Sequence, residues 1–236
     1  MKTDRPHTVA VMQPTYLPWM GYFDLIDQAD VFVFLEDVEF SKQSWQQRNR
    51  IKTSNGILWL TVPVLTKGKS GQMISDVQMN HRSNDMEKHI RAITQSYSKA
   101  PFVKSYIDEL TAILSTPRDR LADLNMDLIR WFCSKLGMKT PLVKNSDLHV
   151  EGSKVERLIN ICRAVGADRY LSTPGSKVYI DEDNRFGPSG IDLVYHEYVH
   201  PTYRQLHGDF VPYLSVLDLL LNEGEGSLSV IRSGRK

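Results

Sequence analysis

A stiff loop is encoded by residues 12–23, which read Met12-Gln13-Pro14-Thr15-Tyr16-Leu17-Pro18-Trp19-Met20-Gly21-Tyr22-Phe23. Before it, the apolar run at residues 8–12 predicts a buried strand, and after it residues 24–29 have the pattern of a helix. The two prolines fix the backbone angle φ at two nearby positions, so the connection between strand and helix is rigid rather than a tether.

This loop is the first candidate for ligand binding, because open α/β sheets bind ligands at the carboxyl ends of their strands. Four of its side chains are expected to contact a substrate: Gln13, Tyr16, Trp19 and Tyr22. The alternative is a proline-braced turn whose aromatic side chains fill the core, since aromatic residues contribute strongly to core burial.

The remaining patterns alternate between strands and helices. A second apolar run at residues 30–35 completes a strand–loop–helix–strand order, which predicts a right-handed βαβ unit with parallel strands. Residues 48–52 alternate in polarity, and Ser54-Asn55-Gly56 predicts a hairpin turn into a partner strand at 57–64. Helical periodicity follows at 84–98, 102–115 and 118–136, then at 153–165 and 215–224, with further strands at 142–144, 169–172 and 191–194.

These patterns together predict the α/β class. The expected architecture is a Rossmann-like parallel sheet core with an antiparallel hairpin and a helical insertion at about residues 84–137. The 236 residues are expected to form a single domain over residues 1–236.

Composition excludes several classes of protein. Twenty-nine basic and 28 acidic residues leave a net charge of +1, which gives no overall electrostatic field to attract long nucleic acid or an anionic membrane.

No window approaches the ~20 apolar residues of a membrane span, so a cytoplasmic protein is expected. Cys133 and Cys162 have neither disulfide nor zinc spacing and are expected to be buried core residues. The sequence identifies no metal site and no resident cofactor.

A cationic strand face is the second candidate site. The period of two places Arg48, Arg50 and Lys52 on one face of a strand, where they would repel one another unless an anion binds there. Guanidinium groups suit phosphate, so a diphosphate or a phosphopantetheine group is the expected guest. The alternative is a solvated edge strand whose charges prevent aggregation.

Acidic residues follow the second predicted strand, at the same edge of the sheet as the proline-rich loop. Of these, Asp37 is a candidate catalytic group that could orient a substrate amine or bind a metal with phosphate. Pairing of these acids with the arginines is the simpler interpretation.

A turn rich in small residues follows the strand predicted at 169–172. Its backbone N–H groups and hydroxyls could form a nest for an anion or an oxyanion, with Ser172, Ser176 and Tyr179 as expected contacts. Gly175-Ser176-Lys177 lacks the spacing of a phosphate-binding P-loop, and a plain turn is an equal alternative.

Histidines and aromatic residues follow the strand predicted at 191–194. In an extended chain His196, Tyr198 and His200 share a face, and either histidine could accept a proton from an incoming amine or alcohol near neutral pH. Tyr203 and Gln205 are expected substrate contacts nearby. A structural role for each histidine is the alternative.

Five groups of residues resemble a known family. They are Gln13-Pro14-x-Tyr16-Leu17-Pro18-Trp19-x-Gly21-Tyr22-Phe23, then Asp37-Val38-x-Phe40-x-Lys42-x-x-Trp45-x-x-Arg48-Asn49-x-Ile51-Lys52, then Trp59-Leu60-Thr61-Val62-Pro63, then Tyr198-x-His200-Pro201-x-Tyr203-x-Gln205, and Leu214-Ser215-x-Leu217-Asp218-Leu219-Leu220-x-Asn222-x-Gly224. Over nearly its whole length the chain resembles the WbqC-like family. That resemblance implies a role in bacterial surface polysaccharide (O-antigen) biosynthesis, with glycine or other amino-acid transferase activity on amino sugars. Lys42 and Asn49 lie within these motifs and are also expected substrate contacts.

The expected function is therefore an acyl or aminoacyl transferase that forms an amide on a nucleotide-linked amino sugar, with His200 as the base. Amide formation needs a neutral amine, a held donor and stabilisation of a tetrahedral oxyanion. The co-substrate would be an activated acyl donor, namely a carrier thioester, an aminoacyl-tRNA or an adenylate, with an acyl carrier protein as a candidate partner. The alternatives are a non-catalytic nucleotide-sugar or carrier binding protein and an ATP-dependent adenylate-forming ligase.

Overall fold

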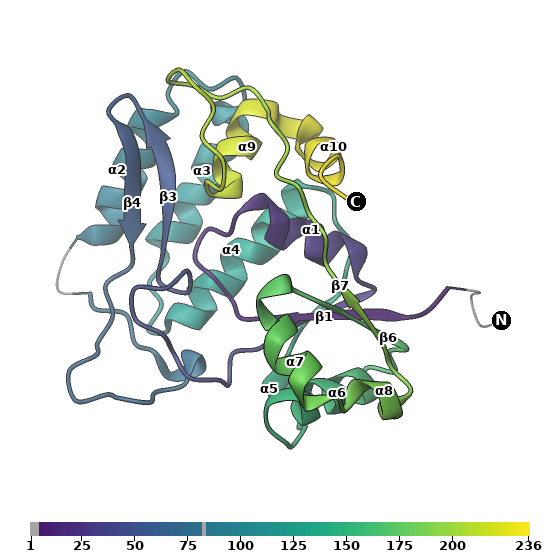
Figure 1. The fold of residues 1–236 in the computed structure, drawn as a ribbon. Coiled ribbons are helices and arrows are strands. Elements are labelled where there is room, and N and C mark those ends of the chain that lie inside the picture. Colours follow the sequence, from purple (N-terminus) through teal and green to yellow (C-terminus); the bar gives the residue numbers. More distant parts are fainter. Residues whose placement is uncertain (1–4, 82–83) are drawn as a thin grey trace.

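A five-stranded parallel sheet forms the centre of the protein in a computed structural model, which describes residues 5–81 and 84–236 (Figure 1). Its strand order is β5-β2-β1-β6-β7, and every neighbouring pair is parallel. The strands are β1 (Thr8–Met12), β2 (Val31–Phe34), β5 (Leu142–Lys144), β6 (Arg169–Ser172) and β7 (Asp192–Tyr195). The chain runs outward from β1 to β5 and then returns to β6 beside β1, which is a Rossmann order. The Rossmann-like parallel sheet predicted from the sequence is thus confirmed.

Both faces of the central strands β1 and β2 are buried, which explains why these two strands are nearly continuous apolar runs. Along β1 the side chains alternate: Val9 and Val11 pack into one apolar cluster, whereas Ala10 packs into the other. On β2, Val33 joins the first cluster, and Phe32 joins the second. The sheet therefore separates two hydrophobic layers.

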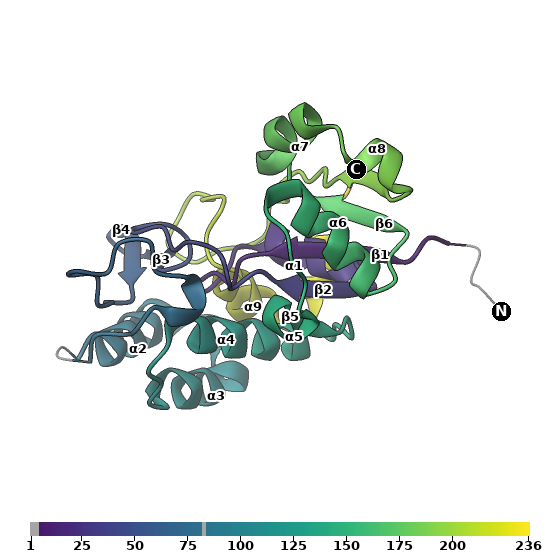
Figure 2. The ribbon, with the colours of Figure 1, turned by 90° about the horizontal axis from the view of Figure 1, so that it is seen from below.

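Helices cover the two faces unequally (Figure 2). The smaller layer contains helices that follow β5 and β6: α5 (Asn145–Leu148), α6 (Lys154–Ala164), α7 (Lys177–Asp183) and α8 (Phe186–Ser189). The larger layer contains α1 (Met20–Gln28), α2 (Asp85–Ser96), α3 (Val103–Ser115), α4 (Leu121–Lys135), α9 (Val216–Glu223) and α10 (Ser227–Arg232). Short 3-10 turns occur at η1 (Ile74–Asp76), η2 (Pro174–Ser176) and η3 (Gly224–Gly226).

The predicted antiparallel hairpin is present, and it stands apart from the sheet, beside α2 (Figure 1). It consists of β3 (Arg48–Thr53) and β4 (Gly56–Thr61), and Gly56 has φ of +102° in the turn. The second strand is shorter than predicted, because the chain leaves the hairpin after Thr61 and Val64 pairs instead with Met79.

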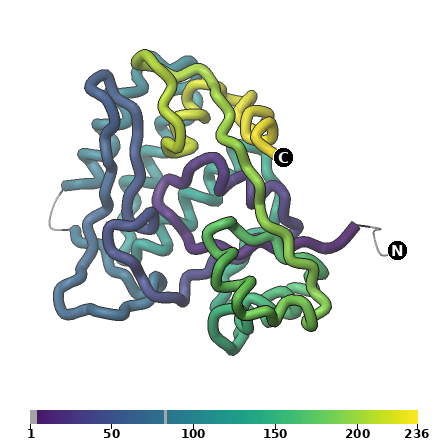
Figure 3. The backbone as a smooth tube through the Cα atoms, in the orientation of Figure 1, coloured from purple at the N-terminus to yellow at the C-terminus, as the bar shows by residue number. Residues whose placement is uncertain are grey.

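A long C-terminal segment, residues 196–215, connects β7 to α9. Figure 3 shows it crossing the molecule and returning between the hairpin and the loop that follows β1. Two backbone hydrogen bonds fix its end there: the Ser215 N–H donates to the Arg50 carbonyl at 3.1 Å, and the Val216 N–H donates to the Pro18 carbonyl at 2.8 Å. The Ser215 side chain caps α9 by accepting from the Leu217 N–H.

Both cysteines are buried helix residues, as predicted. Burial raises the pKa of each thiol, Cys133 and Cys162, to about 12, so the thiolate is disfavoured. Within residues 5–81 and 84–236, the helices are too short or too polar to cross a lipid bilayer.

Tyr16 is completely buried and belongs to the larger apolar layer, next to His89 of α2. Its hydroxyl lies 2.9 Å from the Nδ1 atom of the histidine. Burial lowers the pKa of His89 to about 4, because desolvation disfavours the charged imidazolium. The loop after β1 is therefore joined to α2 through a neutral histidine.

We predict that this histidine makes the folded state sensitive to acid. The unfolded chain takes up a proton on His89 near pH 6.5 but the folded chain only near pH 4, so stability is lost as the pH falls through that interval. The loss amounts to about 3 kcal/mol. Urea unfolding at several pH values should show a shallower decline for His89→Gln than for the wild-type protein. Exposed His81 provides the control, and His81→Gln should keep the wild-type slope. Equal slopes for His89→Gln and wild type would contradict the assignment.

Candidate functional site

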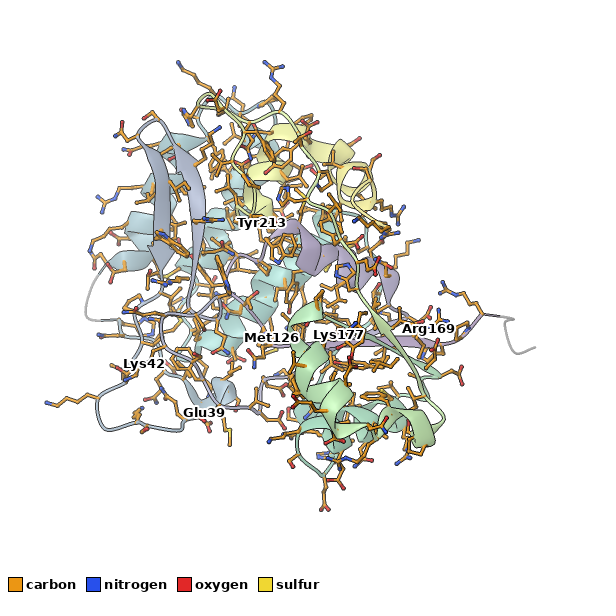
Figure 4. The ribbon with its side chains drawn as sticks, viewed as in Figure 1. Glu39, Lys42, Met126, Arg169, Lys177 and Tyr213 are labelled. Atoms are coloured by element: carbon orange, nitrogen blue, oxygen red, sulfur yellow. The ribbon has the colours of Figure 1, made fainter. Side chains whose placement is uncertain are left out.

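A cavity of about 510 Å³ lies at the carboxyl end of β1, beside the hairpin. Its size is in the range of small-molecule sites, and its position is close to the point where the strand order reverses. Three separate stretches of chain line it: the loop after β1, the segment before and within β3, and the end of the C-terminal segment. The lining residues are Met12, Gln13, Thr15, Pro18, Trp19, Tyr22, Ser41, Ser44, Trp45, Gln46, Asn49, Arg50 and Tyr213. Figure 4 shows Tyr213 between the hairpin and α1.

Aromatic rings form the walls of the cavity. Trp19 precedes the first turn of α1 and lies flat against Gly21, where an added Cβ would come within 2.2 Å of the indole. The Tyr213 ring faces the same indole at a centroid distance of 5.4 Å. Trp45 is half exposed, and the Tyr22 hydroxyl donates to the Gln13 carbonyl at 3.1 Å. These rings offer apolar faces to a flat or ring-shaped ligand.

Amide side chains provide the polar groups. Gln46 donates to the side-chain oxygen of Gln13 at 2.6 Å and accepts from the Ser41 N–H at 3.0 Å. Among the described residues, no acceptor takes the Nε2 hydrogens of Gln13, which are therefore available to a ligand. Asn49 is used for structure: it donates to the carbonyls of Tyr16 and Leu17 at 3.3 and 2.7 Å.

Arg50 supplies the positive charge of the cavity. Its guanidinium donates to the carbonyls of Tyr213 and Pro212 at 3.1 and 3.3 Å, which holds the C-terminal segment over the cavity. Arg48 lies two residues before Arg50 on β3, and its guanidinium is 4.6 Å from the centroid of the Trp59 ring. A guanidinium bound only to neutral carbonyls keeps its charge available for an anion.

Lys52 does not join the two arginines in an exposed cationic face. It is buried, and its Nζ atom donates to the carbonyls of Gly208 and Asp209 at 3.1 and 2.5 Å and to Gln205 Oε1 at 3.3 Å. These three oxygen atoms stabilise the charge of Lys52 within the fold. The lysine supports the C-terminal segment instead.

His200 stacks on Trp19 at a centroid distance of 6.1 Å, so the histidine segment does reach the cavity wall. Both of its ring nitrogens are engaged: Nδ1 donates to the Pro201 carbonyl at 2.8 Å, and Nε2 accepts from the Tyr213 N–H at 3.0 Å. Burial lowers the pKa of His200 below its usual value, which favours the neutral ring that this pattern needs. In this arrangement His200 positions Tyr213.

Tyr203 and Gln205 belong to a polar network behind the cavity wall. Asp218 of α9 is buried and accepts from the hydroxyls of Tyr97 and Tyr203, each at 2.8 Å. Gln205 donates to the Tyr203 hydroxyl at 3.1 Å and accepts from Lys52 at 3.3 Å. Burial raises the pKa of Asp218 despite these bonds. The network fixes the course of the C-terminal segment.

His196 lies away from the cavity lining, in a buried ion network. Its Nε2 atom is 2.7 Å from an oxygen of Asp24, and the other oxygen of Asp24 accepts from Arg235 at 2.6 Å. The predicted shared face is present, because His196 stacks on Tyr198, which meets Trp19 edge-on at 5.7 Å. Its contacts are those of a structural histidine.

Asp37 lies at the carboxyl end of β2, but it does not pair with the hairpin arginines. Both of its carboxylate oxygens accept from the Asn145 amide at 2.9 Å, and it forms an ion pair with Arg157 of α6. The neighbouring Glu36 accepts from the backbone N–H groups of Asn145 and Ser146. These acids secure the start of α5.

The residues predicted for an anion nest lie in a separate cluster at the carboxyl ends of β6 and β7. The Ser172 and Ser176 hydroxyls are 2.6 Å apart, and Ser176 also donates to the Thr173 carbonyl at 2.7 Å. Tyr179 is partly exposed on α7. None of these three residues lines the cavity.

The remaining predicted contacts also lie outside the lining. Tyr16 is a core residue, which agrees with the structural alternative for that position. Lys42 is exposed and points outward in Figure 4. Of the predicted site residues, the structure therefore brings five to the cavity: Gln13, Trp19, Tyr22, Asn49 and Arg50.

Sequence reasoning missed several lining residues. Trp45 belongs to the motif that spans residues 37–52, and Gln46 directly follows this tryptophan. A tryptophan three residues before the cationic strand was therefore a usable signal. Tyr213 gave no such signal, because its place in the cavity depends on hydrogen bonds to Arg50 and His200. These residues are 163 and 13 positions away in the sequence. The described residues include no group of three or more His, Cys, Asp or Glu side chains that could hold a metal ion.

Comparison with known proteins identifies one family and one similar protein. The pattern of the WbqC-like protein family matches residues 13–230. The chain is also 38% identical over 231 residues to a Mycobacterium tuberculosis protein described as uncharacterized protein Rv1507c, an alignment that covers 97% of this chain and 99% of that protein. No solved structure matches the chain.

We predict that Gly21→Ala disturbs the cavity wall. The new methyl group would overlap the Trp19 indole, which must then move or leave its rotamer, at a cost of about 1–3 kcal/mol of folding stability. Urea unfolding and near-UV circular dichroism would measure the loss. Gly187→Ala is the matched control, because a Cβ there meets nothing within 4 Å. Wild-type stability and aromatic dichroism in Gly21→Ala would show that the indole does not lie on Gly21.

Proposed function

This chain belongs to the WbqC-like protein family, and from that membership and the cavity we propose that it is an acyl or aminoacyl (glycine-type) transferase. The reaction forms an amide on the amine of a nucleotide-linked amino sugar. It would take place in the bacterial cytoplasm and serve the biosynthesis of a surface polysaccharide.

The observation that carries the proposal is the combination of aromatic walls with unused amide hydrogens at one cavity. The apolar face of a sugar ring packs well on indole and phenol rings such as those of Trp19 and Tyr213. Hydroxyl and amide substituents of a sugar need donors with fixed directions, and Gln13 Nε2 supplies them. Arg50 adds the charge needed for a phosphate group linked to the sugar.

Amide formation needs the two substrates held together, a neutral amine and a route for one proton. The neutral amine attacks the carbonyl carbon of the acyl donor, a C–N bond forms, and the C–S or C–O bond to the donor breaks. The donor would be a carrier thioester, an aminoacyl-tRNA or an adenylate. One proton leaves the nitrogen, and the departing thiolate or oxyanion, or a base, takes it. No further co-reactant is required.

His200 remains our candidate base. In the proposal, its Nε2 atom becomes free when a bound substrate displaces the Tyr213 N–H that it now accepts. The lowered pKa keeps the imidazole neutral at pH 7, which a base requires. His196 and Asp37 are weaker candidates, since His196 is bound to Asp24 and Asp37 to Arg157.

A second candidate function is non-catalytic binding of the same nucleotide sugar. A specific observation favours it: among the residues that the structure describes, those that line the cavity include no carboxylate, imidazole, thiol or lysine amine. Arg50 is the charged member of the lining, and guanidinium groups do not exchange protons near neutral pH. A binding protein would use the walls and amides described above without turnover.

We predict that purified protein will join an acyl group to a UDP-linked amino sugar, detected by mass spectrometry as an amide product. Gln13→Glu keeps the oxygen that accepts from Gln46 but removes the free donors, so we expect kcat/KM to fall at least 10-fold. Gln95→Glu, the same change on the exposed face of α2, should leave activity unchanged. Ligand binding without product for any donor would exclude the transferase and leave the binding protein. Absence of binding would exclude both.

The role of His200 has its own test. His200→Gln can keep an acceptor for the Tyr213 N–H but cannot act as a base near neutral pH. If His200 is the base, kcat falls about 100-fold or more and the pH dependence near neutrality disappears. An unchanged pH profile with a modest rise in KM would make His200 a positioning residue.

A further inference from the structure

The hairpin has an outward face that is unusual for a solvent-exposed sheet. Its inner face is buried through Asn49, Ile51 and Leu60. On the outer face, Trp59 is 43% exposed and Ile57 is 46% exposed, where polar side chains are the norm. Trp45 is 50% exposed beside them, and its ring lies 5.5 Å from that of Trp59. Exposed aromatic patches of this kind mark binding surfaces.

Two arginines share this outer face. In the register of the hairpin, Arg50 lies opposite Trp59, and Arg48 lies opposite Thr61. Both guanidinium groups lie over the Trp59 ring, at 4.6 and 6.0 Å from its centroid.

Neither hairpin arginine forms an ion pair with a carboxylate in residues 5–81 and 84–236. Elsewhere, by contrast, Arg118 pairs with Asp127, and Arg169 pairs with Asp192. The positive charge on the outer face of the hairpin is therefore not neutralised within the described chain. A complementary ligand should carry negative charge.

We propose that this outer face binds a nucleoside phosphate, with the base on the indoles of Trp59 and Trp45 and the phosphates on Arg48 and Arg50. A planar base stacks on indole and guanidinium planes, and phosphate oxygens accept from guanidinium forks. An acidic peptide would satisfy the arginines but would leave two exposed indoles uncovered. A neutral sugar would cover the indoles but leave two charges unpaired.

The surface is also continuous with the cavity, because Trp45 and Arg50 belong to both. A ligand that runs from base to phosphates to sugar could thus extend from the outer face into the cavity. This inference rests on the proposed function and specifies which part of the substrate lies outside the cavity. The same nucleotide chemistry could come from two sources: the nucleotide-linked sugar acceptor or a nucleotide-bearing acyl donor.

Titration calorimetry with small probes tests the proposal. The probes are UDP, ADP, uridine, adenosine and inorganic pyrophosphate, each added to the full-length protein. We expect at least one nucleotide to bind about 10-fold or more tightly than both its nucleoside and pyrophosphate, because stacking and charge act together. Absence of nucleotide binding at millimolar concentrations would overturn the proposal. Equal affinity for pyrophosphate and nucleotide would show that the surface binds anions without contacting the base, and this result would also overturn the proposal.

Variants assign the binding to the hairpin. Trp59→Leu should weaken nucleotide binding about 10-fold or more and leave pyrophosphate binding unchanged, and Trp59→Phe should restore most of the loss. Arg48→Gln should weaken the binding of both nucleotide and pyrophosphate. Arg91→Gln removes the same charge from the exposed face of α2 and should leave both affinities unchanged. Nucleotide binding that survives both Trp59→Leu and Arg48→Gln would place the nucleotide at another site and contradict the proposal.

Competition separates the two sources and keeps this inference distinct from the proposed function. Displacement of the nucleotide by a saturating nucleotide-linked amino sugar identifies the acceptor as its source. Simultaneous binding of both identifies the donor. Amide product formed by a Trp59→Leu, Arg48→Gln double variant with wild-type KM for both substrates would overturn the inference and leave the transferase intact. Nucleotide binding without any amide product would leave the inference intact and exclude the transferase.

Discussion

The buried backbone of the loop after β1 is the constraint on which the site depends. Residues 14–18 are buried but form no regular structure, so their carbonyl groups need partners from elsewhere in the chain. Two buried asparagines supply partners for three of them: Asn49 donates to the carbonyls of Tyr16 and Leu17, and Asn125 donates to that of Pro14 at 3.1 Å. Asn125 also binds the Gln46 carbonyl at 2.8 Å. The loop, the hairpin and α4 are thereby held in one arrangement.

That arrangement determines what the cavity can bind. With the loop fixed, Trp19 and Gln13 keep their positions at the carboxyl end of β1. The C-terminal segment then closes one side, since Arg50 and His200 hold Tyr213 from two directions. The preformed wall around Trp19 and Gln13 reduces the entropy lost on binding, which suits a site that must align an amine with an acyl donor.

The parts of the fold that depend on local patterns were predictable from sequence. The strand that ends at Met12 and the turn at Asn55-Gly56 follow from periodicity and turn chemistry within a few residues. The roles of polar residues were harder to predict, because their partners are distant. Lys52, His196 and Asp37 have the residue types of catalytic or phosphate-binding groups, yet their partners are 157, 172 and 120 residues away. No local pattern shows that such a group is already engaged in structure.

Hydrogen exchange of backbone amides, measured with and without a nucleotide-linked amino sugar, tests most directly whether three stretches of chain form one binding site. We expect the ligand to slow exchange together in residues 13–22, 41–50 and 208–214, while α7 exchanges as before. Slower exchange confined to the carboxyl ends of β6 and β7, with residues 13–22 and 41–50 unchanged, would contradict the account and place the ligand at the serine cluster instead.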